Sequence, residues 1–278
     1  MKVIIQKPDL DTCLTALIMG IYEKDEIVVS KGEASAEDIM NPDALCIEAG
    51  GSGLVHLNNF DHHNTEEDLT PACMQAYCKK EIMDERLKRL VDYVCIVDDR
   101  PKDNPVIGFP SISNIFSGML LVERKPTHQF LKGIDILHKV LRDDIDPFNT
   151  LPDIEEWRPY IKAKEVNIEK VSEAMKKAEF YTANNGFKIG FVESDSIGGI
   201  GSLYAQGCDV VIMYNLAFGE PPMPKYTIAG NSKKVIHIVK HFDKLETGWG
   251  GRETIIGSPR AGTRLKKEEV LTVVLNNL

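Results

Sequence analysis

Short apolar runs alternate with helix-period segments along the first half of the chain. Four apolar runs have the length of strands, at residues 3–5, 26–30, 44–48 and 54–60. Three segments carry apolar residues every three or four positions, at residues 11–22, 71–82 and 85–97. The first spacing favours strands and the second favours helices. Because the two kinds of segment alternate, we predict a parallel sheet that is covered by helices.

The second half begins with a further helical stretch, at residues 111–144, and a turn-rich segment, at residues 146–153. A long amphipathic helix is then predicted over residues 154–181, with Ile168, Val171, Met175 and Ala178 on its apolar face. Four further strands are expected before a last helix at 266–276, and they cover residues 187–193, 209–214, 225–229 and 235–239. This pattern predicts three parts: an N-terminal domain at 1–145, a connecting segment at 146–186 and a smaller α/β domain at 187–278.

The composition is that of a globular protein, with 278 residues of which 43% are hydrophobic and 27% are charged. No apolar run approaches the roughly 20 residues that cross a membrane, and residues 1–5 do not resemble a signal peptide. Six cysteines lie at irregular spacing without a C-x-x-C pair, which favours a reducing, cytoplasmic location. The net charge of −9 argues against a protein that coats long nucleic acids, although bound divalent metals would cancel part of this charge locally.

Acidic residues and histidines occur at four places where an apolar segment ends. These residues are Asp9 with Asp11, Glu48, Asp61 with His62 and His63, and Asp98 with Asp99. Three of the four places follow predicted strands, and ligands of open parallel sheets gather at the carboxyl ends of the strands. Carboxylates with one imidazole suit Mn²⁺ or Mg²⁺ better than structural zinc. We therefore predict a site for one or two such ions, which would activate water for attack on a phosphoryl group.

The order of these residues resembles the motifs of the DHH phosphoesterases. Asp61, His62 and His63 match the tripeptide that names this family. Residues 8–11, Pro-Asp-Leu-Asp, resemble its first motif, H-x-N-P-D-x-D, and Glu48 stands at the aspartate of its second motif.

Two later segments extend the resemblance over nearly the whole chain. Asp98, with Pro101 three residues further on, resembles the fourth motif of the exonuclease branch. Residues 250–257 keep the glycines of the G-G-H-x-x-A-A-G motif found in the DHH-associated substrate domain. Four motifs in the family's order are far more specific than one tripeptide.

The resemblance implies a fold with a parallel-sheet N-terminal domain, a long connecting helix and a smaller α/β C-terminal domain. It implies five metal ligands, which are Asp9, Asp11, Glu48, His62 and Asp98. It implies catalytic or phosphate-contacting roles for three residues, which are His63, Asp11 and Asp61. It also implies a substrate-binding group in the C-terminal domain, which consists of Arg252, Gly250, Gly251 and Arg260.

Three positions depart from the family's motifs. The histidine of the first motif falls on Ile5, so one metal site loses a ligand. Glu48 replaces an aspartate and reaches about one carbon further. Arg252 replaces the C-terminal histidine, and a guanidinium can bind a phosphate through two hydrogen bonds.

The function that this interpretation predicts is metal-dependent hydrolysis of small phosphodiesters or phosphoanhydrides. The partner would be a small phosphate-containing substrate, such as a nucleotide, a polyphosphate or a short single-stranded oligonucleotide. The substrate and the oligomeric state, including a homodimer, stay open. A second hypothesis is a catalytically degenerate DHH-type protein that binds nucleotides or phosphates in a regulatory role. A dehydrogenase that uses the glycines of residues 50–53 fits less well, because the G-x-G-x-x-G pattern is missing.

Simpler structural roles exist for several of these residues. Asp9 and Asp11 could cap the helix that follows them. Glu48 could be a solvated charge at the end of a strand. Arg252 could pair with Glu253 or with another acid at the surface and add almost nothing to stability or binding.

Overall fold

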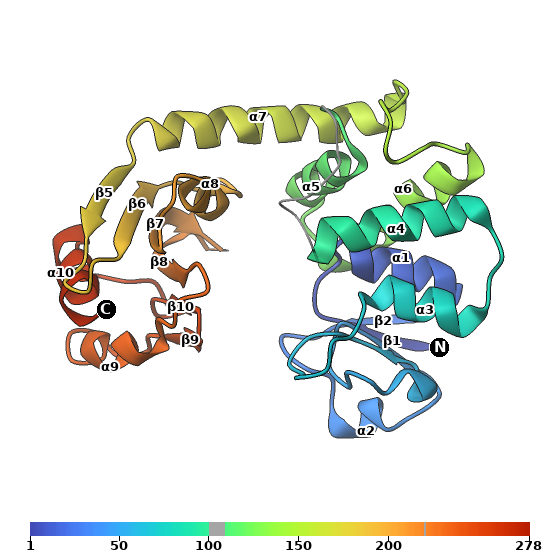
Figure 1. Cartoon of the computed structure of the whole chain (residues 1–278), viewed down its shortest axis with the longest axis horizontal. Helices are drawn as coiled ribbons and strands as arrows, with labels where there is room; N and C mark the ends of the chain where they lie inside the picture. Colours follow the sequence, from blue (N-terminus) through green and yellow to red (C-terminus); the bar gives the residue numbers. More distant parts are fainter. Residues whose placement is uncertain (100–108, 220) are drawn as a thin grey trace. The chain divides into compact units, whose positions relative to one another are not determined.

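A computed structural model describes residues 1–99, 109–219 and 221–278. The chain divides into two compact units, Met1–Lys164 and Glu165–Leu278, and each contains its own sheet. The boundary falls within helix α7 (Arg158–Met175). Figure 1 follows the chain from the blue N-terminal unit to the red C-terminal helix. Among the described residues, no helix has the length and apolarity that a membrane crossing requires.

The first unit contains a four-stranded sheet in which all strands are parallel. The strands lie in the order β2-β1-β3-β4, and their bounds are β1 Lys2–Ile5, β2 Glu26–Val29, β3 Ala44–Ile47 and β4 Asn59–Phe60. Ile5 pairs with Ile47, and Ile47 pairs with Phe60. Three strands therefore end at one edge of the sheet, and Glu48 and Asp61 follow immediately. This confirms the predicted parallel sheet.

Alternate residues of the strands face two apolar layers, as the two-residue period of a strand requires. Val3, Ile5, Leu45 and Ile47 belong to the main core. Ile4 and Cys46 belong to a smaller cluster on the other face. Five helices supply most of the main core, and they are α1 Leu10–Met19, α3 Ala72–Lys80, α4 Glu85–Asp99, α5 Ile112–Val122 and α6 Pro126–Arg142. The short helix α2 (Ala36–Ile39) contacts β3.

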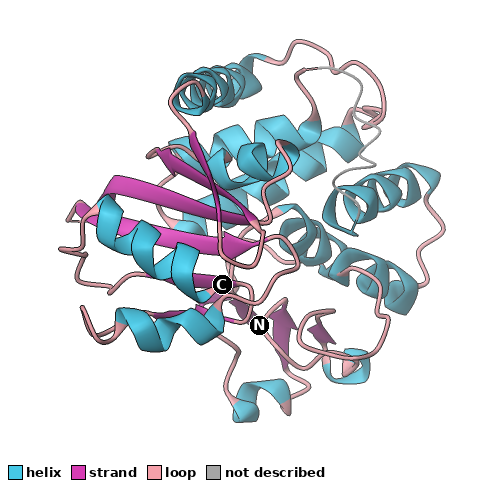
Figure 2. Ribbon diagram, turned by 60° about the vertical axis from the view of Figure 1, so that its left-hand side comes forward, coloured by secondary structure: helices cyan, strands magenta, loops and turns pink. Residues whose placement is uncertain are grey.

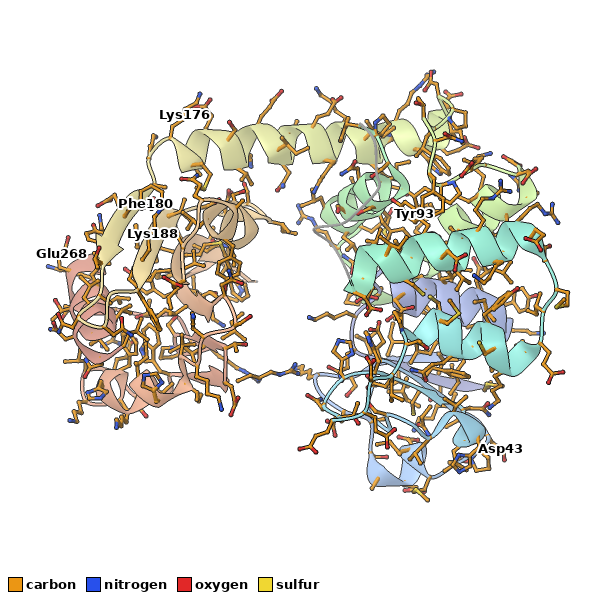
Figure 3. The ribbon with its side chains drawn as sticks, viewed as in Figure 1. Asp43, Tyr93, Lys176, Phe180, Lys188 and Glu268 are labelled. Carbon is orange, nitrogen blue, oxygen red and sulfur yellow. The ribbon has the colours of Figure 1, made fainter. Side chains whose placement is uncertain are left out.

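Tyr93, labelled in Figure 3, ties two of these helices together. Its side chain is fully buried in α4, and its hydroxyl accepts a hydrogen bond from the Ser113 backbone N–H of α5 at 3.2 Å. The predicted helical stretch over 111–144 is two helices rather than one. Pro126 opens the second of them, because proline lacks the N–H that a helix interior needs and fits the first turn.

The second unit contains a six-stranded mixed sheet in the order β5-β6-β7-β8-β10-β9. Its strands are β5 Glu179–Thr182, β6 Lys188–Glu193, β7 Val210–Phe218, β8 Met223–Gly230, β9 Gly250–Arg252 and β10 Ile255–Gly257. Only β6 and β7 run parallel among these described pairings. Lys188 on β6 lies over the ring of Phe180 on β5, with its ammonium nitrogen 5.0 Å from the ring centre (Figure 3).

Helices pack against this sheet, as the ribbon in Figure 2 shows. Helices α9 (Val239–Phe242) and α10 (Lys267–Asn277) contribute Phe242, Val270 and Val274 to the larger apolar cluster. Helix α8 (Gly199–Ala205) contributes Leu203 to a second cluster.

Four sequence-based predictions about local structure were wrong. The long helix ends at Met175 instead of Tyr181, and residues 179–182 form the edge strand β5. Ile168 is 45% exposed and does not line an apolar face, whereas Met175 and Ala178 do pack against the cluster that contains Leu203. Residues 235–239 form helical turns rather than a strand, and most of the predicted strand at 54–60 is a 3₁₀ turn before β4. Apolar runs of this length fit either structure, and tertiary packing decides between them.

Candidate metal centre

Asp9 and Asp11 lie at the start of α1, directly beyond the buried end of β1. Asp9 is the N-cap of α1, and its Oδ1 accepts a hydrogen bond from the Thr12 N–H at 3.1 Å. Asp11 is 1% exposed and does not cap α1. Its two oxygens accept hydrogen bonds from the backbone N–H groups of Ala72 and Cys73, both at 2.8 Å. Asp11 therefore satisfies the first N–H groups of α3, which have no partner within that helix.

Glu48 follows β3 in an uncommon backbone conformation. Its φ angle is +47°, a region that residues other than glycine rarely occupy. The side chain is buried, and its Oε2 accepts a hydrogen bond from the Thr12 hydroxyl. A strand-end glutamate in solvent, which was one alternative from the sequence, is therefore wrong for this residue. Backbone strain of this kind persists only where the surrounding structure holds it.

Asp61 holds two loops together beneath the histidines. Its Oδ2 accepts a hydrogen bond from the Gly50 N–H at 2.6 Å, and its Oδ1 accepts one from the His63 N–H at 2.8 Å. The His63 ring nitrogen Nδ1 also lies 3.1 Å from Oδ1. Burial opposes ionisation of Asp61, but these hydrogen bonds outweigh it and lower the pKa of the carboxyl. Its contacts are those of a group that fixes the position of His63.

The two histidines differ in exposure and in partners. The His62 side chain is 12% exposed, and its Nε2 lies 3.2 Å from Asp98 Oδ2 and 3.7 Å from Glu48 Oε1. The His63 side chain is 54% exposed, and its bond with Asp61 raises the pKa of the imidazole. His62 thus faces the carboxylates, whereas His63 offers its other nitrogen toward solvent.

Asp98 and Asp99 end α4 and approach different nitrogens of His62. Asp98 faces Nε2, the nitrogen that also faces Glu48, whereas Asp99 Oδ1 lies 3.8 Å from Nδ1. This geometry agrees with the choice of Asp98 over Asp99 as the candidate ligand. Pro101, which supported that choice in the sequence, lies outside the described residues.

Two sets of potential ligand atoms result from this arrangement. Oxygen and nitrogen atoms of Asp11, His62 and Asp98 lie within 4.8 Å of one another, and so do those of Glu48, His62 and His63. The His62 Nε2 belongs at the centre of this cluster. It is buried and makes no well-aligned hydrogen bond to any described residue. A buried polar atom without such a bond is costly unless another partner takes it up.

The electrostatics of the cluster also fit a cation. Burial and the negative charge of Glu48 raise the pKa of Asp11 to about 7, and the same two causes raise the pKa of Asp9 well above its usual range. Hydrogen bonding to Asp98 and Glu48 raises the pKa of His62 to about 10. In the metal-free protein, protons therefore neutralise charges that a divalent ion would otherwise balance. Carboxylates with one imidazole are a donor set for Mn²⁺ or Mg²⁺.

Thr12 is a residue of this cluster that the sequence motifs did not identify. It is completely buried, one residue after Asp11, and it connects α1 to Glu48, which lies 36 residues further along the chain. The available signal was a polar residue on a helix face that is otherwise apolar. A threonine in that position has several structural explanations, so the pattern alone did not predict the contact.

The residues predicted to bind substrate lie in the other unit, on and after the β9–β10 hairpin. A Cβ atom on Gly251 would lie 2.1 Å from the Ile255 carbonyl oxygen, so this glycine is required by packing, whereas Gly250 has open space at the same position. Arg252 and Arg260 are exposed. Within the described ranges, neither guanidinium forms a hydrogen bond or an ion pair.

The expected structural alternative for Arg252 was a pair with Glu253. Glu253 instead pairs with Lys234, with an oxygen–nitrogen distance of 3.1 Å. The Arg252 guanidinium therefore keeps all its donors for solvent or for a ligand.

Comparison with known proteins identifies the fold. No protein-family profile matches the chain, and no curated protein matches its sequence. A pGpG-specific phosphodiesterase, PggH, from Vibrio cholerae aligns over 99% of this chain and 96% of its own, with a TM-score of 0.60 and 12% identity. The DHH domain of a member of a family of ribosomal proteins aligns over 98% of this chain and 84% of its own, with a TM-score of 0.56 and 12% identity. The chain therefore has the DHH fold that the sequence motifs indicated.

Proposed function

We propose that the chain is a metal-dependent phosphoesterase that hydrolyses small phosphodiester or phosphoanhydride substrates. The observation that carries this proposal is the buried cluster of Asp11, Glu48, His62 and Asp98, with the His62 Nε2 lacking a well-aligned hydrogen bond to any described residue. The structural similarity to a pGpG-specific phosphodiesterase supports it, and a short dinucleotide is therefore the first substrate to test.

Four side chains would hold one divalent ion, Mn²⁺ or Mg²⁺, and they are Asp11, Glu48, His62 and Asp98. When bound, such an ion lowers the pKa of a coordinated water and polarises a phosphoryl oxygen. A second ion would have Asp9 and Glu48 as its protein ligands. The buried alkyl side chain of Ile5 supplies no donor where the family's first motif has a histidine. We therefore expect one tightly bound ion and a weaker second one.

His63 would contact the substrate rather than the metal. Its Nδ1 is directed to Asp61, so the Nε2 edge remains for a phosphoryl oxygen. The raised pKa of His63 favours the imidazolium, which donates a charged hydrogen bond to an anion. Asp61 would act through His63 by fixing the orientation of its ring.

Arg252 and Arg260 would bind a phosphate of the substrate through the C-terminal unit. The support for this role is that both guanidiniums are exposed and that Glu253 is already paired with Lys234. A guanidinium can form two parallel hydrogen bonds with a terminal phosphate.

The test is hydrolysis in the presence of Mn²⁺ of pGpG, other short oligonucleotides, cyclic dinucleotides, pyrophosphate and polyphosphate. We expect turnover of at least one of these by the wild type and its loss in the Asp98→Asn variant. A wild type that binds Mn²⁺ but hydrolyses none of them would contradict the enzymatic proposal. That result would instead favour the second candidate, a regulatory phosphate-binding protein, which the histidine replaced by Ile5 makes conceivable.

A further inference from the structure

Thr12 occupies a position between the two motifs that supply carboxylates to the cluster. Its backbone is fixed twice, because its N–H donates to the Asp9 cap and because it lies in the first turn of α1. A threonine also has few side-chain rotamers, since its Cβ is branched. The hydroxyl is therefore held rigidly where it donates to Oε2 of Glu48.

The two carboxylate oxygens of Glu48 have different partners. Oε2 is bound by Thr12, whereas Oε1 lies 3.7 Å from His62 Nε2 and 3.8 Å from His63 Nδ1. These distances exceed those of direct hydrogen bonds, and Glu48 belongs to a set of potential metal ligands. The division leaves one oxygen for structure and one for the ion.

A glutamate needs such an anchor more than an aspartate does. Its side chain has one more rotatable bond, and ordering it in one rotamer costs conformational entropy. Glu48 also starts from a left-handed backbone, with φ at +47°. Partners that orient a ligand in this way typically change metal affinity by about 10–100-fold.

We propose that Thr12 is a positioning residue for metal binding, which holds Oε2 of Glu48 and thereby directs Oε1 toward the ion. This inference rests on the proposed function, because it requires that Glu48 binds a metal. It assigns a role to a residue that belongs to none of the motifs quoted above.

The experiment is calorimetric titration of the full, EDTA-treated chain with Mn²⁺. Thr12→Val removes the hydroxyl and keeps the shape, and we expect its Kd to rise by about 10–100-fold. Thr12→Ser keeps the hydroxyl and should restore binding to nearly the wild-type affinity. Thr15→Val is the matched control, because Thr15 is also fully buried in α1 and its hydroxyl has no hydrogen-bond partner among the described residues. This control should bind Mn²⁺ as the wild type does.

A mutant cycle separates this role from a merely structural one. In a Glu48→Asp background the carboxylate is about one carbon shorter and should not reach the Thr12 hydroxyl, so Thr12→Val should have little further effect on the Kd. If Thr12→Val does not fold by circular dichroism, Thr12→Ala takes its place. Equal Kd values for Thr12→Val and the wild type would overturn the inference, and so would an equal loss in both Glu48 backgrounds. A wild type that binds no Mn²⁺ would instead refute the proposed function itself.

Discussion

Replacement of Asp11 by asparagine should separate the cost of burying its charge from the benefit of binding a metal. Asp11 is 1% exposed, and burial with the charge of Glu48 raises its pKa from 3.8 to about 7 in the metal-free protein. An acid with a raised pKa keeps its proton in the folded state after the unfolded state has lost it. The free energy of unfolding therefore falls as the pH rises from about 4 to about 7, and this contribution is constant above that range.

The magnitude follows from the same values. Between pH 5 and pH 8, the titration of Asp11 spans roughly two pH units below its folded pKa, at about 1.4 kcal/mol per unit. The metal-free wild type should thus lose on the order of 3 kcal/mol relative to Asp11→Asn over this interval. A constant offset between the two proteins is also expected, because the asparagine NH₂ group cannot accept from the N–H groups of Ala72 and Cys73 together with the amide oxygen.

The assay is urea unfolding in EDTA at several pH values, followed by tryptophan fluorescence. The sequence has two tryptophans, and Trp249→Phe leaves the buried Trp157 as the reporter of the first unit. Addition of Mn²⁺ at about 100 times its Kd should stabilise the wild type by about 2.7 kcal/mol and the variant by much less. Parallel pH profiles for the two proteins would refute the assignment of this pH dependence to Asp11. Equal stabilisation by Mn²⁺ would refute its role as a ligand.

Three further predictions concern other residues described above. His62→Ala should remain folded by circular dichroism but bind Mn²⁺ more than about tenfold more weakly in a calorimetric titration, and an unchanged stoichiometry and Kd would remove His62 from the ligand set. Arg252→Ala should raise KM for a 5′-phosphorylated dinucleotide by the equivalent of about 1.5–3 kcal/mol without changing Mn²⁺ affinity, and an equal loss on the unphosphorylated dinucleotide in steady-state kinetics would argue against a phosphate clamp. Gly251→Ala should lower the melting temperature of the protein because its Cβ would meet the Ile255 carbonyl, whereas Gly250→Ala should not, and the two melting curves decide this directly.

The sequence predicted those parts of the fold that depend on local periodicity. The parallel strands and helices of the first unit follow from apolar runs that alternate with helix-period segments. Residues 235–239 failed this test, because a run of valine and isoleucine fits a buried strand and a buried helical turn equally well. The end of α7 failed for a related reason, since residues 179–182 continue the helical pattern but pair with β6.

Candidate site residues were predictable where a strand end or a motif marks them. The structure brings together Asp11, Glu48, His62 and Asp98, as their order along the chain suggested. The contacts that hold them depend on residues far apart in sequence, and no local pattern contains this information. Asp11 meets the start of α3 61 and 62 residues later, and Thr12 meets Glu48 after 36.

The contacts of Asp61 change what the tripeptide motif can indicate about relatives of this protein. Its carboxylate joins the loop at Gly50 to the loop at His63 through hydrogen bonds from backbone N–H groups, and the residue itself is buried. A descendant that lost its chemistry would still need this aspartate in order to fold. Retention of the first letter of the motif therefore records ancestry and foldability, and it is a poor marker of turnover. The residues that should disappear first when selection for catalysis is relaxed are His62 and Asp98.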